Sequence, residues 1–66
     1  MVRLSVNGVE QTTMGKNIVQ LLDELHLQGR SIAVEKNGDI VPRSQFAIEP
    51  LADGDRLEIV TAIGGG

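Results

Sequence analysis

The chain has 66 residues, no cysteine, one histidine, one aromatic residue and a formal net charge of −3 at pH 7. That length makes one small domain, and the absence of cysteine excludes disulfides, thiolate metal sites and a catalytic thiol. Proteins that bind nucleic acid usually carry a basic patch and stacking aromatic residues. The acidic balance and the single Phe46 therefore argue against a nucleic-acid partner.

Membrane and metal sites are not expected either. No apolar run reaches the ~18 residues of a membrane span, and strand-like alternation from Val2 onward does not resemble a signal peptide. A single histidine, His26, does not make a conventional zinc site. We therefore expect a cytoplasmic protein that contacts no membrane and binds no metal or cofactor of its own.

Residues 1–13 predict a β-hairpin. Three aliphatic residues alternate with polar ones, the period-2 pattern of a half-buried strand: Val2, Leu4 and Val6. Asn7-Gly8 follows at once, and both residues accept the positive φ angles of a type I′ turn. Residues 9–13 then form the return strand, which ends before Gly15.

A helix is predicted next. Four aliphatic residues recur at helical spacing and would share one face: Ile18, Leu21, Leu22 and Leu25. Asn17 suits the N-cap, with Gln20 three residues later as part of a capping box. Gly29 is the expected stop, and His26 is expected on the surface of the last turn. Such a short helix must be held by packing on the sheet.

The second half of the chain predicts three more strands. Residues 32–35 and 40–41 read as a short hairpin around the turn at Asn37-Gly38-Asp39, and Pro42 ends it because proline cannot donate to a ladder. Residues 43–50 are irregular, and we expect Phe46 and Ile48 to close one end of the core.

The last strand follows the turn at Asp53-Gly54-Asp55 and alternates strictly. The face expected to meet the helix comprises Leu57, Ile59, Thr61 and Ile63, and the opposite face comprises Arg56, Glu58, Val60 and Ala62. Exposed aliphatic side chains on that second face, Val60 and Ala62, are candidates for contact with a partner protein.

The order of elements predicts an α+β fold in which one helix lies across one face of a mixed sheet. The first and last strands would pair in parallel at the sheet centre, which is the β-grasp, or ubiquitin-like, layout. Residues 1–63 would make the β-grasp domain and residues 64–66 a flexible tail. The helix aliphatics should then pack against four strand residues: Leu4, Val6, Leu57 and Ile59.

The closing glycines, Gly64, Gly65 and Gly66, have two interpretations. Glycine loses the most backbone entropy on ordering, so a frayed terminus is one interpretation. The other is a thin stalk that threads into a narrow active site of a partner, where any β-carbon would clash. In that case the reactive group is the α-carboxylate of Gly66 and not a side chain.

Several segments together resemble one known family: Val6-Asn7-Gly8, residues 18–22, residues 33–43, Asp53-Gly54-Asp55 and the closing glycines. Over essentially its full length the chain resembles the sulfur carrier proteins of thiamine biosynthesis, the ThiS type. The resemblance implies that a ubiquitin-activating-like adenylyltransferase uses ATP to adenylate Gly66. Sulfur from a persulfide donor then gives a thiocarboxylate, which thiazole synthase uses. The carrier itself would not be an enzyme.

Three other functions remain open from the sequence. One is a carrier like the small subunit of molybdopterin synthase, a family whose members usually run longer than this chain. Another is a ubiquitin-like protein modifier, which would use the same free glycine end. The third is a β-grasp module that binds RNA or protein, with the glycines as frayed ends; the acidic balance argues against RNA. Sulfur carriage is the preferred interpretation.

Overall fold

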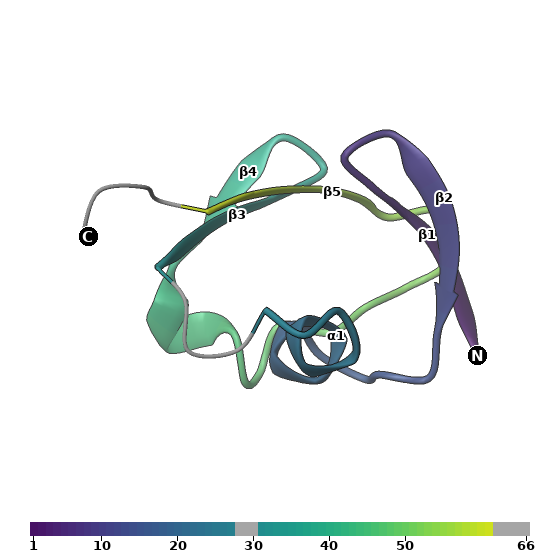
Figure 1. The fold of residues 1–66 in the computed structure, drawn as a ribbon, viewed down its shortest axis with the longest axis horizontal. Helices are drawn as coiled ribbons and strands as arrows, with labels where there is room; N and C mark the ends of the chain where they lie inside the picture. Colours follow the sequence, from purple (N-terminus) through teal and green to yellow (C-terminus); the bar gives the residue numbers. More distant parts are fainter. Residues whose placement is uncertain (28–30, 62–66) are drawn as a thin grey trace.

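The computed structural model of the chain describes residues 1–27 and 31–61. Their elements, in chain order, are β1 (Val2–Val6), β2 (Val9–Thr13), α1 (Ile18–Glu24), β3 (Ile32–Lys36), β4 (Asp39–Val41), the 3₁₀ turn η1 (Arg43–Gln45) and β5 (Arg56–Thr61). Within this part of the chain α1 lies across one face of a mixed sheet, as Figure 1 shows. The predicted α+β, β-grasp architecture is confirmed.

Strand β5 occupies the middle of the sheet, whose order is β2-β1-β5-β3-β4. It runs parallel to β1, with Val6 opposite Leu57, and antiparallel to β3, with Val34 opposite Ile59. The two hairpins, β1–β2 and β3–β4, flank it on either side. The first and last strands therefore pair at the sheet centre, as predicted.

Both predicted Asn-Gly turns are formed. Asn7 and Gly8 have φ angles of 51° and 85°, and Asn37 and Gly38 have φ angles of 54° and 90°. Positive φ at both central residues is the geometry of a type I′ turn, whose twist matches the strands it joins. Asparagine tolerates this region better than most residues because its short polar side chain can bond locally.

The side chains of these two asparagines also form hydrogen bonds with the backbone of β5. Asn7 Oδ1 accepts from the Ile59 amide at 2.8 Å, and Asn7 Nδ2 donates to the Ile59 carbonyl at 3.0 Å. The Asn7 amide also donates to the carbonyl of Leu57 at 2.9 Å. One side chain thus continues the parallel β1–β5 ladder beyond the last residue of β1.

Asn37 makes the equivalent contacts from the other side. Its amide donates to the Arg56 carbonyl at 2.8 Å, and its Oδ1 accepts from the Arg56 amide at 2.8 Å. Its Nδ2 donates to Asp55 Oδ1 at 3.0 Å. The hairpin turns on both sides of β5 are therefore fastened to that strand.

Helix α1 begins as predicted and ends earlier than predicted. Asn17 Oδ1 accepts from the Gln20 amide at 2.9 Å, and Gln20 Oε1 accepts from the Lys16 amide at 2.7 Å, one residue before the N-cap. At the other end the chain takes a positive φ of 60° at the exposed His26. The expectation that Gly29 stops the helix is wrong, because α1 already ends at Glu24. Gly29 itself lies outside the described residues.

The stop at His26 has the hydrogen bonds of a Schellman motif. The His26 amide donates to the Asp23 carbonyl at 3.0 Å, and the Leu27 amide donates to the Leu22 carbonyl at 2.8 Å. These bonds satisfy carbonyls that the end of a helix leaves without intrahelical partners. Histidine is one of the few non-glycine residues that enter this region with some frequency.

The core lies between α1 and the sheet. Its buried residues are Leu4, Val6, Ile18, Leu21, Leu22, Val34, Val41, Phe46, Leu51, Leu57 and Ile59. This confirms the predicted packing of the helix on β1 and β5, although Leu25 is only partly buried. Phe46 closes one end of the core as expected.

The expectation that Ile48 joins Phe46 in the core is wrong, since Ile48 is 68% exposed. The amides of Ile48 and Glu49 both donate to the Gln45 carbonyl, so the chain continues to turn after η1. That turning leaves Phe46 inside and Ile48 outside. Leu51, a few residues later, is buried instead.

Replacing Leu22 with alanine tests how much the packing of this small core contributes to stability. Leu22 is 5% exposed, and its truncation should lower the free energy of unfolding by about 2–5 kcal/mol. Ile48→Ala is the matched control, because removing an exposed aliphatic should change that free energy by no more than about 0.5 kcal/mol. Urea unfolding of both variants measures the difference, and equal stabilities would contradict the described packing.

Replacing Asn7 with aspartate should test the bond to β5 without disturbing the turn. Aspartate tolerates positive φ but its carboxylate has no N–H for the Ile59 carbonyl, so stability at pH 7 should fall by about 1–3 kcal/mol. Asn17→Asp is the control, since an N-cap needs only an acceptor and aspartate serves as well. Thermal melts that rank the two variants equally would rule out the proposed role of Asn7.

Candidate functional site

Of the predicted site residues, the structure describes Val60. It lies on β5, it is 63% exposed, and it points away from the helix, because its neighbours Leu57 and Ile59 are the buried residues of this strand. The prediction that Val60 is exposed on the uncovered side is confirmed. Ala62, Gly64, Gly65 and Gly66 lie outside the described residues, so what they do remains a prediction.

The side of the sheet that faces away from α1 is uncovered, as Figure 1 shows above β3, β4 and β5. We call its exposed residues on these three strands the open face: Ala33, Glu35, Ile40, Arg56, Glu58 and Val60. Their order follows from the register, in which Val60 lies opposite Ala33 and Glu58 lies opposite Glu35, which in turn lies opposite Ile40. The open face therefore combines apolar side chains with two carboxylates and the guanidinium of Arg56.

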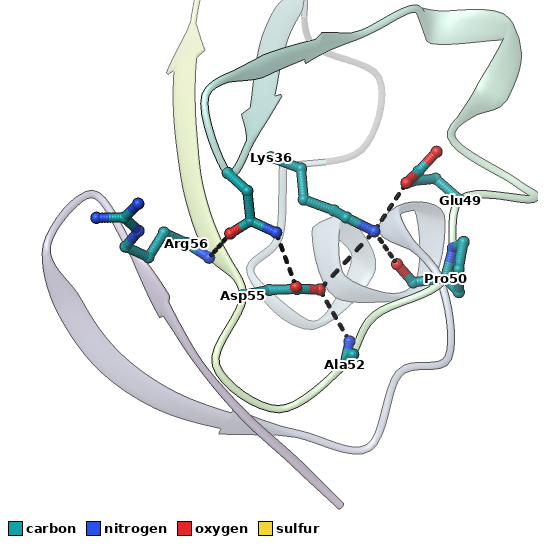
Figure 2. A network of polar contacts seen from close by, with 7 residues as sticks. Lys36, Glu49, Pro50, Ala52, Asp55 and Arg56 are labelled. Carbon is teal, nitrogen blue, oxygen red and sulfur yellow. Dashed lines mark hydrogen bonds and ion pairs between the residues drawn. The ribbon is translucent and has the colours of Figure 1, made fainter.

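A network of charged groups anchors the start of β5 (Figure 2). Asp55 is only 7% exposed, and its Oδ2 accepts from the Ala52 amide at 2.9 Å. Lys36 Nζ lies 2.8 Å from Glu49 Oε2 and 3.9 Å from Asp55 Oδ2, and it donates to the Pro50 carbonyl at 2.9 Å. A buried carboxylate needs such partners, because an isolated one would be strongly destabilising. The network therefore holds the chain in place where β5 begins.

The turn before β5 is also tied to β1. The Arg3 amide donates to Asp53 Oδ1 at 2.9 Å, and the Gly54 amide donates to the Arg3 carbonyl at 2.8 Å. Beside this turn lies a surface depression lined in part by Ser5 and Glu10. The depression is at the start of β5, whereas Val60 is near its end, so the two do not form one site.

A hydroxyl and a carboxylate meet between β2 and α1, at Thr13 and Glu24. Thr13 Oγ1 donates to Glu24 and accepts from the Gly15 amide at 2.9 Å, while Glu24 Oε2 accepts from the Met14 amide at 3.1 Å. Thr13 is buried, and both side chains are engaged in closing the β2–α1 connection. A substrate could not reach this hydroxyl, so the pair is structural.

The described residues form neither a metal site nor a membrane-spanning helix. No group of three or more histidine, cysteine, aspartate or glutamate side chains in residues 1–27 and 31–61 is placed to hold a metal ion. Helix α1, of seven residues, falls far short of a membrane span, and no other helix in the described part of the chain is long and apolar enough for one.

Sequence reasoning missed the interactions that hold β5. The motifs Asn7-Gly8 and Asp53-Gly54-Asp55 predicted turns, but they carried no sign that Asn7 would bond to Ile59, some fifty residues later in the chain. The burial of Asp55 was missed as well, because its partners Asn37 and Lys36 are distant in the sequence. A weak signal was present, since asparagine and aspartate in turns often bond to nearby backbone.

Comparison with known proteins places this geometry in a family. The family model described as the ThiS family matches residues 4–66. A crystal structure of the thiamine biosynthesis protein ThiS from Geobacter metallireducens superimposes with a TM-score of 0.82 at 35% identity, covering 98% of this chain and 100% of that one.

Two curated relatives differ greatly in length. The sulfur carrier protein ThiS of Escherichia coli is 34% identical over 56 residues, which are 85% of each chain. A thiazole synthase of Paramagnetospirillum magneticum is 46% identical over 65 residues, but the chain spans only 20% of that protein's length. Because the family model covers nearly the whole sequence and the fold agrees with a solved member, the chain belongs to the ThiS family.

Proposed function

We propose that this protein is a cytoplasmic sulfur carrier for thiamine biosynthesis, which delivers sulfur as a thiocarboxylate on Gly66. The observation that carries the proposal is the position of β5. This strand is fastened on both sides by asparagine side chains and leads without a linker into residues 62–66, the segment that ends in three glycines. A firmly held strand next to a side-chain-free end suits a carrier whose end must enter another protein's active site.

The chemistry requires an activation step. A carboxylate is a poor electrophile until one of its oxygens becomes part of a good leaving group. A ubiquitin-activating-like adenylyltransferase would transfer AMP from ATP to the carboxylate of Gly66 and release pyrophosphate. A persulfide sulfur then attacks the acyl carbon and displaces AMP, and cleavage of the resulting S–S bond by a thiol leaves the thiocarboxylate. ATP is thus the partner's substrate, and this chain needs no cofactor.

The glycines of residues 64–66 suit this chemistry because they have no side chains. Without β-carbons, Gly64, Gly65 and Gly66 can pass through a channel that would exclude any other residue. Ordering each of them costs about 1–2 kcal/mol of backbone entropy, which backbone hydrogen bonds to the partner must offset. The carrier supplies the acyl group and a surface for docking, while the catalytic groups belong to its partners.

The relatives support the same role. The Escherichia coli relative is named a sulfur carrier protein, and the Paramagnetospirillum magneticum relative is named a thiazole synthase. Similarity to part of a thiazole synthase supports thiazole synthase as the protein that takes up the sulfur. The alternatives, a molybdopterin-synthase-like carrier and a ubiquitin-like modifier, would also use a glycine carboxylate, so an experiment must separate them.

Intact-mass spectrometry separates these alternatives. The purified protein is incubated with ATP, its adenylating enzyme and a persulfide donor, and then with thiazole synthase and the other thiazole precursors. We expect a mass gain equal to sulfur minus oxygen, located on Gly66, that disappears as thiazole forms. Covalent adducts to lysine side chains would instead identify a protein modifier. A thiocarboxylate that thiazole synthase fails to consume would contradict the role in thiamine synthesis.

Changing the length of the tail should abolish adenylation while leaving the fold intact. Deleting Gly66 moves the carboxylate back by up to ~3.6 Å, and one added alanine moves it forward by the same distance, both outside the geometry of in-line attack. ATP–pyrophosphate exchange measures the activation. Thermal melts of both variants should match the parent protein. Full exchange activity in the deletion variant would show that Gly66 is not the reactive end.

A charge at Val60 should weaken docking to the adenylating enzyme, as the exposure of this side chain on the open face suggests. Val60→Asp should raise the dissociation constant ~10-fold or more, because a carboxylate would be buried against an apolar partner surface. Val9→Asp is the matched control, since Val9 is similarly exposed but lies on β2 at the far edge of the sheet. Equal affinities of the two variants, measured by calorimetry, would remove Val60 from the interface.

A further inference from the structure

Two asparagines of this chain are followed by glycine, at Asn7-Gly8 and Asn37-Gly38. Asn-Gly is the dipeptide most prone to spontaneous deamidation, because glycine has no β-carbon to hinder its backbone nitrogen. That nitrogen loses its proton and attacks the side-chain Cγ of the asparagine, and ammonia leaves as a five-membered succinimide ring closes. Water then opens the ring at either carbonyl and gives aspartate or isoaspartate. The reaction needs no enzyme.

The fold holds both dipeptides in a geometry that prevents ring closure. All four residues have positive φ, between 51° and 90°, as in a type I′ turn. The ψ angle at the first central residue of that turn is about +30°, which places the following nitrogen on the opposite side of the Cα–C bond from Cβ. The attacking atom and Cγ are therefore kept apart. Both asparagines are exposed, so this geometry protects them and burial does not.

Hydrogen bonds restrain the two side chains as well. Asn7 Oδ1 and Nδ2 bind the amide and the carbonyl of Ile59, at 2.8 and 3.0 Å. Asn37 Oδ1 accepts from the Arg56 amide at 2.8 Å, and its Nδ2 donates to Asp55 Oδ1 at 3.0 Å. Each side chain must leave these partners before its Cγ can turn toward the glycine nitrogen. Deamidation therefore requires the turn to open, either locally or with the whole domain.

The products at Asn37 do not fit the native contacts. Aspartate there would set an oxygen against Asp55 Oδ1 in place of an N–H, and Asp55 is only 7% exposed. Two carboxylates at such a site repel each other strongly. Lys36 offers limited relief, since its Nζ lies 3.9 Å from Asp55 Oδ2 and 2.8 Å from Glu49 Oε2. Isoaspartate would also add a methylene to the main chain inside a two-residue turn.

We propose that Asn7-Gly8 and Asn37-Gly38 are deamidation sites that the native fold protects, and that reaction at Asn37 makes unfolding progressively irreversible. A chain that stays unfolded long enough loses an amide that holds β5 and returns to a less stable fold. The modification thus records the time that a small domain with little stability in reserve has spent unfolded. This inference concerns the chain alone and does not depend on the proposed function.

Mass spectrometry with peptide mapping measures the reaction. The whole protein is incubated at mildly alkaline pH, in buffer and in urea above its unfolding midpoint, and replacement of NH₂ by OH is followed at each asparagine. In urea both Asn-Gly sites should react, and Asn17 should react far more slowly because the β-branched Ile18 follows it. In buffer the Asn-Gly sites should react ~100-fold or more slowly than in urea. Similar rates in the two solutions would overturn the proposed protection.

Asn37→Asp supplies the aspartate product in uniform form. Its melting temperature should lie about 5–15 °C below that of the parent, because the new carboxylate faces Asp55. Asn17→Asp is the matched control, since it adds the same charge at an N-cap that accepts aspartate. The control should melt within about 2 °C of the parent. If both variants melt at the same temperature, reaction at Asn37 has no special consequence and the proposal is wrong.

Exchanging the two groups isolates the cause of the loss. In the double variant Asn37→Asp/Asp55→Asn an amide again faces a carboxylate, and the amide oxygen at position 55 can still accept from the Ala52 amide. About half or more of the lost melting temperature should return, because the two substitutions compensate each other. A double variant no more stable than Asn37→Asp would show that repulsion between carboxylates is not the cause.

Refolding tests the consequence for the whole protein. Samples taken from urea after increasing times are diluted into buffer and melted. The fraction that melts like the parent should fall in step with deamidation at Asn37, as measured by peptide mapping of the same samples. If chains deamidated at Asn37 refold and melt like the parent, the modification does not make unfolding irreversible and the proposal is overturned.

Discussion

The bidentate bond between the Asn7 side chain and the backbone of Ile59 is the constraint on which much of this structure depends. The parallel ladder between β1 and β5 is short, with Ser5 opposite Arg56 and Val6 opposite Leu57. Such a short parallel pairing forms few hydrogen bonds. Closing the long loop between β1 and β5 nevertheless costs conformational entropy. The asparagine adds two bonds at the point where the ladder of β1 would otherwise end, and it places them on the strand that leads to the tail.

Other polar contacts also hold β5 in place. Asn37 binds Arg56 and Asp55 from the β3–β4 turn, and Lys36 joins Asp55 to Glu49. A core of this size leaves little stability in reserve. Directional polar contacts at the ends of one central strand therefore complement the apolar packing of α1. They also hold the strands that carry the open face in a fixed register.

The sequence predicted well those features that depend on neighbouring residues. Alternation of Val2, Leu4 and Val6 identified β1 and its buried face, helical spacing identified the packed face of α1, and the Asn-Gly pairs identified both turns. The open face followed from the same alternation, which placed Val60 opposite the buried side of β5. Each of these patterns is complete within a few residues of the chain.

What the sequence did not reveal depends on groups distant in the chain. The bond of Asn7 to Ile59 and the burial of Asp55 exist because the fold brings together segments about fifty and about eighteen residues apart. The stop at His26 and the exposure of Ile48 are decided by local hydrogen bonds that compete with stronger propensities, glycine at a helix end and burial for isoleucine. The like-charged pair on the open face became visible only once the register of β3 and β5 was known.

The central position of β5 also has a consequence for the order of events during synthesis. Because β1 pairs with a strand some fifty residues later, the centre of the sheet cannot close until β5 has been made. Contacts of such sequence separation are slow to form, since the loop entropy must be spent first. The hairpin β1–β2 and the helix must therefore wait, incompletely buried, until β5 has left the ribosome. A nascent chain that stops before β5 would therefore leave the apolar faces of β1 and α1 incompletely covered, which makes it a target for chaperones.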